Sequence, residues 1–230
     1  MNLLALDTSS VSCTVALQQG DKIIERHEER PREHTRLLVP MIRSLLEEAK
    51  AKIGELDAIV LGNGPGSFIG MRIAASVAQG LGFASGINII PVSSLAAVAA
   101  QVLAEHDATE VAVAQDAHMN EVYLGIYARD DSGCMKHLIA ERIQTQEAIS
   151  ELSRAVDGRR FAAGFGWSRY PALLEHNRGR IDQVVDILHP RARYLLKLGA
   201  EAIEAGESII PADVVPAYLR QKVAQKPAPP

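Results

Sequence analysis

Alternating apolar and polar positions divide the first half of the chain into short strands and amphipathic helices. Apolar runs predict strands over residues 3–6, 14–18, 22–27, 58–61 and 87–91. A helical period predicts helices over residues 35–52, 67–84 and 93–105. The strand over residues 3–6 ends at Asp7, and Gly20 lies in the tight turn between the second and third strands. The first half therefore begins with the order βββαβα.

The second half repeats this order. Its patterns predict strands over residues 111–115, 121–128, 136–143, 160–163 and 184–188, and helices over residues 146–156 and 190–205. The first of these strands ends at Asp116, as the first strand of the chain ends at Asp7. Two βββαβα units that face each other form a cleft lined by the Asp-bearing turns, as in actin, hexokinase and Hsp70. We therefore predict an α/β, actin-like fold (ASKHA, ribonuclease H-like) with duplicated domains over residues 1–105 and 106–212 and a tail over residues 213–230.

A glycine-rich loop over residues 62–72, GNGPGSFIGMR, joins a predicted strand to a predicted helix. We expect Gly62, Gly64 and Gly66 to adopt positive φ angles and to permit close backbone approach. Ser67 is expected to cap the following helix. Such a loop binds an anion or a nucleotide with backbone groups, although similar connections also occur without a ligand. It has neither the lysine of a P-loop nor the spacing of a dinucleotide fingerprint.

The candidate nucleotide-binding residues lie in this loop and in the two Asp-bearing turns. They are Asp7, Thr8, Gly64, Gly66, Ser67 and Asp116. For Asp7 and Asp116 the alternative is turn formation or capping by a short acceptor side chain. The sequence firmly implies no cofactor; ATP or ADP is the candidate ligand, either at the cleft or at an interface with a partner.

Composition narrows the range of partners. The net charge of −4 over 230 residues argues against a broad, sequence-independent grip on nucleic acid, which needs clustered Lys and Arg. Any RNA contact is therefore expected to be local or made by a partner. Cys13 and Cys134 are too few for a disulfide framework, and we expect both to be buried free thiols. Because the sequence has neither a basic leader nor a long uncharged apolar run, we expect a cytoplasmic protein without membrane contact.

Five segments together resemble the TsaB (YeaZ) family over nearly the whole chain. They are LLALDTSSVSCTVAL, GNGPGSFIGMRIAASVAQGL, VSSLAAVA, DAHMNEVYLGIY and PAYLRQKVA. The resemblance implies a role in forming N6-threonylcarbamoyladenosine (t6A) at position 37 of tRNAs that read codons beginning with A. It also implies that the chain is the non-catalytic partner of TsaD, which transfers the threonylcarbamoyl group, and that the ATPase TsaE joins them. The chain would then reach tRNA only through the complex.

Differences from TsaD argue against independent catalysis. The comparison with TsaD implies two metal-binding histidines at the positions that Ser94 and Val98 occupy here. Neither residue can replace an imidazole as a ligand, so we expect no metal site. The serines near turns lack the Gly-x-Ser-x-Gly elbow of a hydrolase, and we expect no peptidase activity. His118 stands where the family's Asp-Ala-Arg motif has arginine.

Two predicted helices provide a candidate partner surface. The helix over residues 35–52 carries a continuous apolar stripe, and the helix over residues 67–84 has small residues at intervals of four. The resemblance implies that these helices form either a homodimer or the heterodimer with TsaD. The candidate interface residues are Leu38, Met41, Ile42, Leu45, Met71, Ala74, Ala75 and Ala78. We expect some of them to be exposed in the monomer; packing against the sheet is the alternative.

The sequence also leads to expectations for the C-terminal tail and leaves two alternative functions open. Tyr218 and Leu219 are expected to anchor the tail to the body, and residues 226–230 to be disordered. The alternative function is a stand-alone nucleotide-binding kinase of the actin/hexokinase superfold. Such a kinase needs metal-anchoring carboxylates in both phosphate turns, for which only Asp7 and Asp116 qualify. A structural homodimer without a ligand is the third interpretation.

Overall fold

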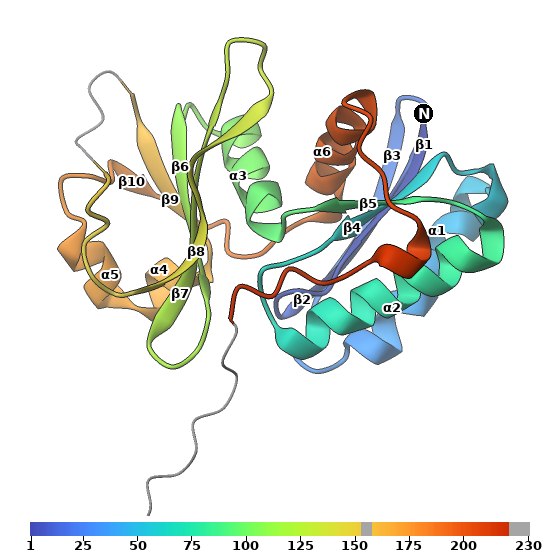
Figure 1. The fold of residues 1–230 in the computed structure, drawn as a ribbon, viewed down its shortest axis with the longest axis horizontal. Coiled ribbons are helices and arrows are strands. Elements are labelled where there is room, and N and C mark those ends of the chain that lie inside the picture. The colour runs from blue at the N-terminus through green and yellow to red at the C-terminus, as the bar shows by residue number, and fades with distance from the viewer. Residues whose placement is uncertain (153–157, 221–230) are drawn as a thin grey trace, which may run out of the picture.

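The computed structural model describes residues 1–152 and 158–220 and contains two five-stranded sheets (Figure 1). The first sheet has the order β3-β2-β1-β4-β5. Its strands are β1 (Asn2–Asp7), β2 (Ser12–Gln19), β3 (Lys22–Glu29), β4 (Ala58–Gly62) and β5 (Ile89–Val92). Strand β1 pairs antiparallel with β2 and parallel with β4. The carboxyl ends of β1 and β4 therefore lie side by side, and this places Asp7 next to the glycine-rich loop.

The second sheet has the same topology, in the order β10-β9-β6-β7-β8. Its strands are β6 (Glu110–Asp116), β7 (Glu121–Arg129), β8 (Met135–Thr145), β9 (Arg160–Ala163) and β10 (Gln183–Val184). Strand β6 pairs antiparallel with β7 and parallel with β9, as β1 pairs with β2 and β4. This shared topology confirms the predicted duplication of an α/β unit.

Helices form three layers around the two sheets (Figure 1). They are α1 (His34–Ala49), α2 (Phe68–Ser85), α3 (Ser94–Glu105), α4 (Phe165–Arg169), α5 (Pro171–His176) and α6 (Ala192–Glu204), with short 3-10 helices η1 (Ile53–Glu55) and η2 (Pro211–Asp213). Helices α1 and α2 cover the outer face of the first sheet. Helices α3 and α6 fill the space between the sheets, and α4 and α5 cover the outer face of the second sheet.

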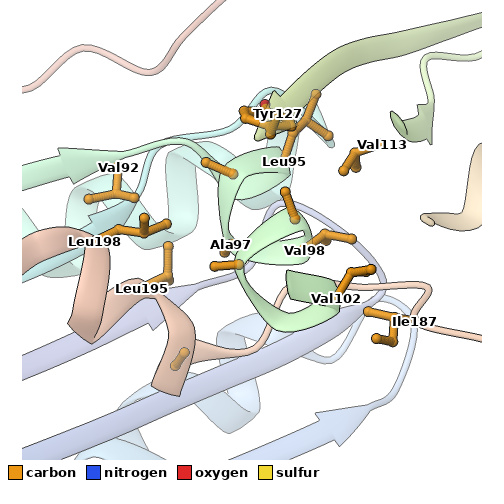
Figure 2. Close-up of a cluster of buried hydrophobic side chains, with 14 of the residues drawn as sticks. Val92, Leu95, Ala97, Val98, Val102, Val113, Tyr127, Ile187, Leu195 and Leu198 are labelled. Carbon is orange, nitrogen blue, oxygen red and sulfur yellow. The ribbon is translucent and has the colours of Figure 1, made fainter. Parts of the chain in front are cut away.

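Helix α3 is apolar on nearly every side because it lies between the two sheets (Figure 2). All residues over 94–102 are buried. Leu195 and Leu198 of α6 approach the helix from the side of the first sheet, and Val113 and Tyr127 approach it from the second sheet. A helix that is hydrophobic all round is typical of a central core position. One apolar cluster therefore joins the two units.

The helix predicted over residues 146–156 is absent from residues 146–152, and residues 153–157 lie outside the described part of the chain. The backbone N–H of Ile149 donates to the side-chain oxygen of Asn177 at 2.9 Å. A contact with a residue far away in the sequence thus replaces the first turn of the predicted helix. The hydrophobic pattern of residues 146–156 could not indicate this hydrogen bond, because Asn177 lies elsewhere in the sequence.

The end of the second unit also differs from the prediction. The strand predicted over residues 184–188 is reduced to the two residues of β10. Helices α4 and α5 follow β9, where the sequence indicated only a glycine turn. They contain five and six residues, too few for a helical period to be detected.

Helix α6 belongs to the second half of the sequence but packs against the first sheet. The N–H of Ala192 donates to the hydroxyl of Thr14 at 3.0 Å. Arg191 forms an ion pair with Glu25 at 2.7 Å. The predicted division into domains places α6 in the second domain, over residues 106–212, although the helix packs against the sheet of the first. The division into two domains and a tail therefore remains a proposal.

Residues 214–220 run from the first unit to the second, alongside α2 (Figure 1). The N–H of Ala217 donates to the carbonyl of Asn63 at 3.0 Å. At the far end, Arg220 donates to the carbonyl of Ala117 at 3.0 Å. Leu219 packs against the central apolar cluster. Residues 221–230, which include the end expected to be disordered, lie outside the described part of the chain.

The two cysteines lie in different environments. Cys13 is buried, but Cys134 is exposed between β7 and β8, so the expectation of two buried thiols is wrong for Cys134. Burial raises the pKa of the Cys13 thiol to about 12, which keeps it protonated. None of the helices in the described residues combines the length and the apolar character needed to cross a membrane.

Candidate functional site

A cleft of about 670 Å³ lies between the two units. Gly66 and Ser67 of the glycine loop form part of one wall, and Asp116 and His118 of the turn after β6 form part of the opposite wall. The N-terminus of α2 borders the cleft, so its first N–H groups and its dipole favour an anion there. The cleft therefore has the backbone elements of an anion site, with the glycine loop on one side.

Asp7 does not reach this cleft, because its carboxylate is completely buried behind the wall. It accepts hydrogen bonds from the N–H of Ser9 at 2.6 Å and from the hydroxyl of Ser94 at 2.5 Å. The same hydroxyl accepts the N–H of Gly64 at 3.0 Å. Asp7 thus connects the turn after β1, the glycine loop and the first residue of α3.

Burial is the largest influence on the pKa of the Asp7 carboxyl. Desolvation raises the pKa of its carboxyl from 3.8 to about 6, although the hydrogen bonds from Ser94 and Ser9 offset part of the increase. A carboxylate whose oxygens are already engaged and which lies away from the solvent cannot take part in ligand chemistry in the cleft. The hydrogen bond from the N–H of Ser9 agrees instead with the alternative interpretation, in which Asp7 stabilises a turn.

Close backbone packing explains the glycine loop better than unusual φ angles do. Of the three glycines expected to have positive φ, only Gly64 does, at 89°. A Cβ at Gly62 would lie within 3.0 Å of the Asp7 side chain, and a Cβ at Gly66 would lie equally close to the carbonyl of Ser9. The prediction of positive φ is therefore wrong for Gly62 and Gly66, whereas that of close approach is confirmed. Ser67 caps α2, since its hydroxyl accepts the N–H of Gly70 at 3.2 Å.

Asp116 occupies the corresponding place in the second unit and remains accessible. Its side chain is 19% exposed. It accepts the N–H of His118 at 2.7 Å, the same turn contact that Asp7 makes with Ser9, and the hydroxyl of Tyr170 at 2.7 Å. The duplicated turns thus share their backbone geometry but differ in burial, and only the second presents a carboxylate to the cleft.

The structure divides the candidate nucleotide-binding residues into two groups. The cleft is lined by Gly66, Ser67 and Asp116. Behind its wall lie the buried residues Asp7, Thr8 and Gly64. Thr8 is engaged structurally, because its hydroxyl donates to the carbonyl of Gly70 at 2.6 Å. The sequence placed both groups in the right turns, but it did not indicate which side chains face solvent.

Most of the residues that line the cleft were not among the candidates from the sequence; they include Arg32, His34, Phe165 and His189. His34 contacts the carbonyl of Ser10 through Nε2 at 2.9 Å. His189 is buried beside Phe165, and desolvation lowers the pKa of its imidazole. These side chains come from distant parts of the chain, so no sequence spacing indicated that they meet.

The eight candidate interface residues on α1 and α2 are buried within the monomer. Leu45 is 0% exposed and Met71 is 3% exposed, so the expectation that such residues stay exposed before assembly is wrong. The apolar stripe of α1 packs against the first sheet and α2, which corresponds to the core alternative. Other apolar residues on the same two helices are exposed, including Val39 at 47% and Phe83 at 85%. Val39 lines a groove of about 500 Å³ between α1 and α2, whereas Phe83 is not among the residues that line it.

Known proteins match this arrangement over the full chain. The model of the family described as TsaD, tRNA N6-adenosine threonylcarbamoyltransferase, matches residues 25–162. The tRNA threonylcarbamoyladenosine biosynthesis protein TsaB of Escherichia coli K12 is 32% identical over 229 residues, covering 100% of this chain and 99% of the relative. The TsaB protein of Haemophilus influenzae is 34% identical and covers 100% of this chain and 98% of the relative. This chain belongs to the TsaB family.

A solved structure of the family supports the fold as well. YeaZ from Pseudomonas aeruginosa superposes with a TM-score of 0.87 at 38% identity, covering 95% of this chain and 99% of that chain. The actin-like fold predicted from the duplicated order of elements is confirmed. Ser94 and Val98, for which the resemblance implied histidines in TsaD, have structural contacts in this TsaB-family chain: Ser94 donates a hydrogen bond to Asp7, and Val98 is fully buried in the central apolar cluster.

Replacing Gly70 with alanine tests the close packing of the glycine loop. A Cβ there would collide with the carbonyl of Thr8, so we expect Gly70→Ala to lower the free energy of unfolding by about 3 kcal/mol. Gly80→Ala is the matched control, because the same helix leaves open space around that position. The control should gain about 0.5–1 kcal/mol. Urea denaturation of both variants decides this, and equal effects would contradict the packing argument.

The raised pKa of Asp7 predicts a pH-dependent stability. Between pH 4 and 6 the folded protein binds this proton more tightly than the unfolded chain does, so Asp7 makes the free energy of unfolding fall as the pH rises. Above pH 6 the full cost, about 3 kcal/mol, is present. Asp7→Asn cannot ionise, and the stability of the wild type relative to this variant should therefore decrease from pH 4 to pH 7. A difference that does not change with pH, measured by denaturation at each pH, would show that Asp7 is not the titrating group.

Proposed function

We propose that this chain acts in the formation of t6A in tRNA, as the non-catalytic partner of TsaD. The observation that carries the proposal is the match over the full length to TsaB proteins at 32–34% identity. The site agrees with a non-catalytic role, because only one of the two turn aspartates, Asp116, lines the cleft, and the other, Asp7, is buried. The paralogue TsaD would then carry out the transfer, and this chain would support it through contacts.

The outer face of α1 and α2 is the surface that we assign to TsaD or to a second copy of the chain. Exposed Val39 and Phe83 lie on these helices, and the groove between them is lined by Ile42, Leu46 and Leu81. Exposed apolar side chains on two neighbouring helices favour a helical partner. In this proposal TsaE joins the pair, tRNA is reached only through the complex, and the assembly works in the cytoplasm.

ATP or ADP remains a candidate ligand of the cleft, through Gly66, Ser67 and Asp116. The N-terminus of α2 and the glycine loop support binding of phosphate. The stand-alone kinase is less well supported, because phosphoryl transfer with metal ions needs carboxylates that reach the nucleotide from both turns. Asp7 is 0% exposed, and its oxygens are already hydrogen-bonded.

Reconstitution of tRNA modification tests the proposed function directly. With tRNA, ATP and a donor of the threonylcarbamoyl group supplied, we expect t6A to form when TsaD, TsaE and this chain are present together, and not when this chain is omitted. The isolated chain, supplied with divalent metal, should neither modify tRNA nor cleave peptides. Formation of t6A at an unchanged rate without this chain would refute the proposal, as would turnover by the isolated chain. Isothermal titration with ATP and ADP, alone and with TsaD, separates the kinase interpretation from the partner role.

Two aspartate substitutions on α1 separate the core from the partner surface. Leu45→Asp buries a carboxylate in the core and should lower the free energy of unfolding by about 3 kcal/mol or more. Val39→Asp lies on the exposed face and should change it by less than about 0.5 kcal/mol, yet weaken binding to TsaD and self-association. Circular dichroism and sedimentation of each variant provide the measurement. Val184→Asp, at an exposed site on β10, is the control for added charge.

If Val39→Asp assembled like the wild type, the outer face of α1 would not be the interface.

A further inference from the structure

The groove between α1 and α2 offers an apolar surface formed by two neighbouring helices. Its volume is about 500 Å³, and its larger aliphatic side chains are Val39, Ile42, Leu46 and Leu81. The three on α1 are spaced by three and four residues, so they lie on one side of that helix. Val39 is 47% exposed, whereas Ile42 is 4% exposed and belongs to the core. The groove therefore extends the core to the surface, where a partner helix can pack an aliphatic side chain between α1 and α2.

The lining of this groove is positively charged, unlike the chain as a whole. Its charged residues are three cations and one carboxylate: Arg43, Lys50, Lys52 and Glu47. All four are exposed. The lining therefore carries a net positive charge of two, although the net charge of the chain is −4. The positive charge is thus a local property of this surface, and on balance the groove attracts an acidic ligand.

In the part of the chain that the structure describes, none of the three cations of the lining forms an ion pair. Glu47 follows Arg43 by four residues and precedes Lys50 by three, so all three lie near one another on α1, yet Glu47 pairs with neither. The next residue, Glu48, does pair with Arg26. The groove therefore leaves its cations available to carboxylates of a partner.

A second copy of the chain fits this groove poorly. In a symmetric dimer each copy presents the same surface to the other. Two copies would together bring six cations but two carboxylates to the contact, so at least four cations would stay without a partner. Like charges brought together across an interface lower the affinity. The charge of the groove therefore disfavours self-association and favours a different protein that brings carboxylates.

An RNA strand also fits the groove less well than an acidic protein segment does. Phosphates could pair with the cations, but they gain nothing from the aliphatic side chains of the lining. Among the described residues that line the groove none is aromatic, so bases find no stacking platform there. A segment with both aliphatic and acidic side chains uses the whole lining.

We infer that this groove docks an acidic, amphipathic helix of TsaD and selects it over a second copy of the chain. The aliphatic side chains of that helix pack against Val39 and Leu46, and its carboxylates pair with the cations Arg43, Lys50 and Lys52. The inference rests on the proposed function, which makes TsaD a partner at this face, and adds to it the charge of the contacting segment. Charges around an apolar contact determine the choice of partner more than the total affinity, so the three cations are specificity determinants.

Charge reversal at Arg43 and at Lys52 tests this selection. Either Arg43→Glu or Lys52→Glu leaves two cations and two carboxylates in the lining. Both positions are exposed, so the melting temperature should stay within a few degrees of that of the wild type. Each variant should bind TsaD about tenfold more weakly in titration calorimetry, yet associate with itself more tightly in sedimentation equilibrium, because the repulsion between copies is removed. A variant that only damaged packing would weaken both associations.

Two controls accompany the reversals. Arg43→Lys keeps the charge and should retain most of the affinity for TsaD. Lys136→Glu, at an exposed position on β8, reverses a charge outside the groove and should bind TsaD like the wild type. Raising NaCl from about 50 mM to about 500 mM should weaken the wild-type complex more than the Arg43→Glu complex, since salt screens exposed charges.

The outcomes separate this inference from the proposed function. If the wild type binds TsaD and supports t6A formation but both charge-reversal variants bind TsaD equally well, the acidic segment is wrong and the proposed function stands. If the wild type binds itself more tightly than it binds TsaD, or if each variant weakens both associations, selection by charge is overturned. If the variants keep full TsaD binding but lose tRNA binding in fluorescence anisotropy, the groove contacts RNA and the inference is overturned. If the wild type does not bind TsaD and does not affect t6A formation, both the inference and the proposed function are wrong.

Discussion

The packing of α3 between the two sheets is the interaction on which the rest of the structure depends. The helix buries its whole circumference over residues 94–102, with α6 and the first sheet on one side and the second sheet on the other. Its N-terminal residues also organise the site. Ser94 hydrogen-bonds Asp7 and the glycine loop, and Ser93 hydrogen-bonds Glu141 of β8. The element that joins the two units therefore also sets the geometry of the cleft.

The two halves keep the same topology but use their equivalent turns differently. In the first unit the aspartate is buried, and the glycine loop packs so closely on the turn after β1 that side chains at Gly62 and Gly66 would collide with it. In the second unit Asp116 remains at the surface of the cleft. In the closed first turn, Asp7 and Ser94 link β1, the loop after β4 and α3 by hydrogen bonds. The same closure removes a carboxylate from any chemistry in the cleft.

Under the proposed non-catalytic role the chain acts through contacts, and its exposed apolar residues agree with that proposal. Two grooves contain exposed apolar side chains: Phe68 and Ile69 line one at the start of α2, and Val39 of α1 lines the other. The tail contributes to one of them: it spans from Asn63 in the glycine loop to Ala117 in the second unit and carries Tyr218 between these ends. The tail therefore contacts both units and contributes Tyr218 to this groove.

The sequence by itself determined the repeated order of elements, because strands and long helices have hydrophobic periods that need no knowledge of their neighbours. It also located the glycine loop, the Ser67 cap and the two aspartate turns, and its motifs identified the TsaB family. Tertiary structure alone decided which groups face solvent: the stripe of α1 was visible in the sequence, but only packing showed that Leu45 is covered and Val39 is not. The same holds for the cleft, which is lined by residues as far apart as His34 and His189, and for residues 146–152, where the side chain of Asn177 accepts the backbone N–H of Ile149. Local periodicity records which residues avoid water, whereas burial of a particular side chain depends on elements that are distant in the sequence.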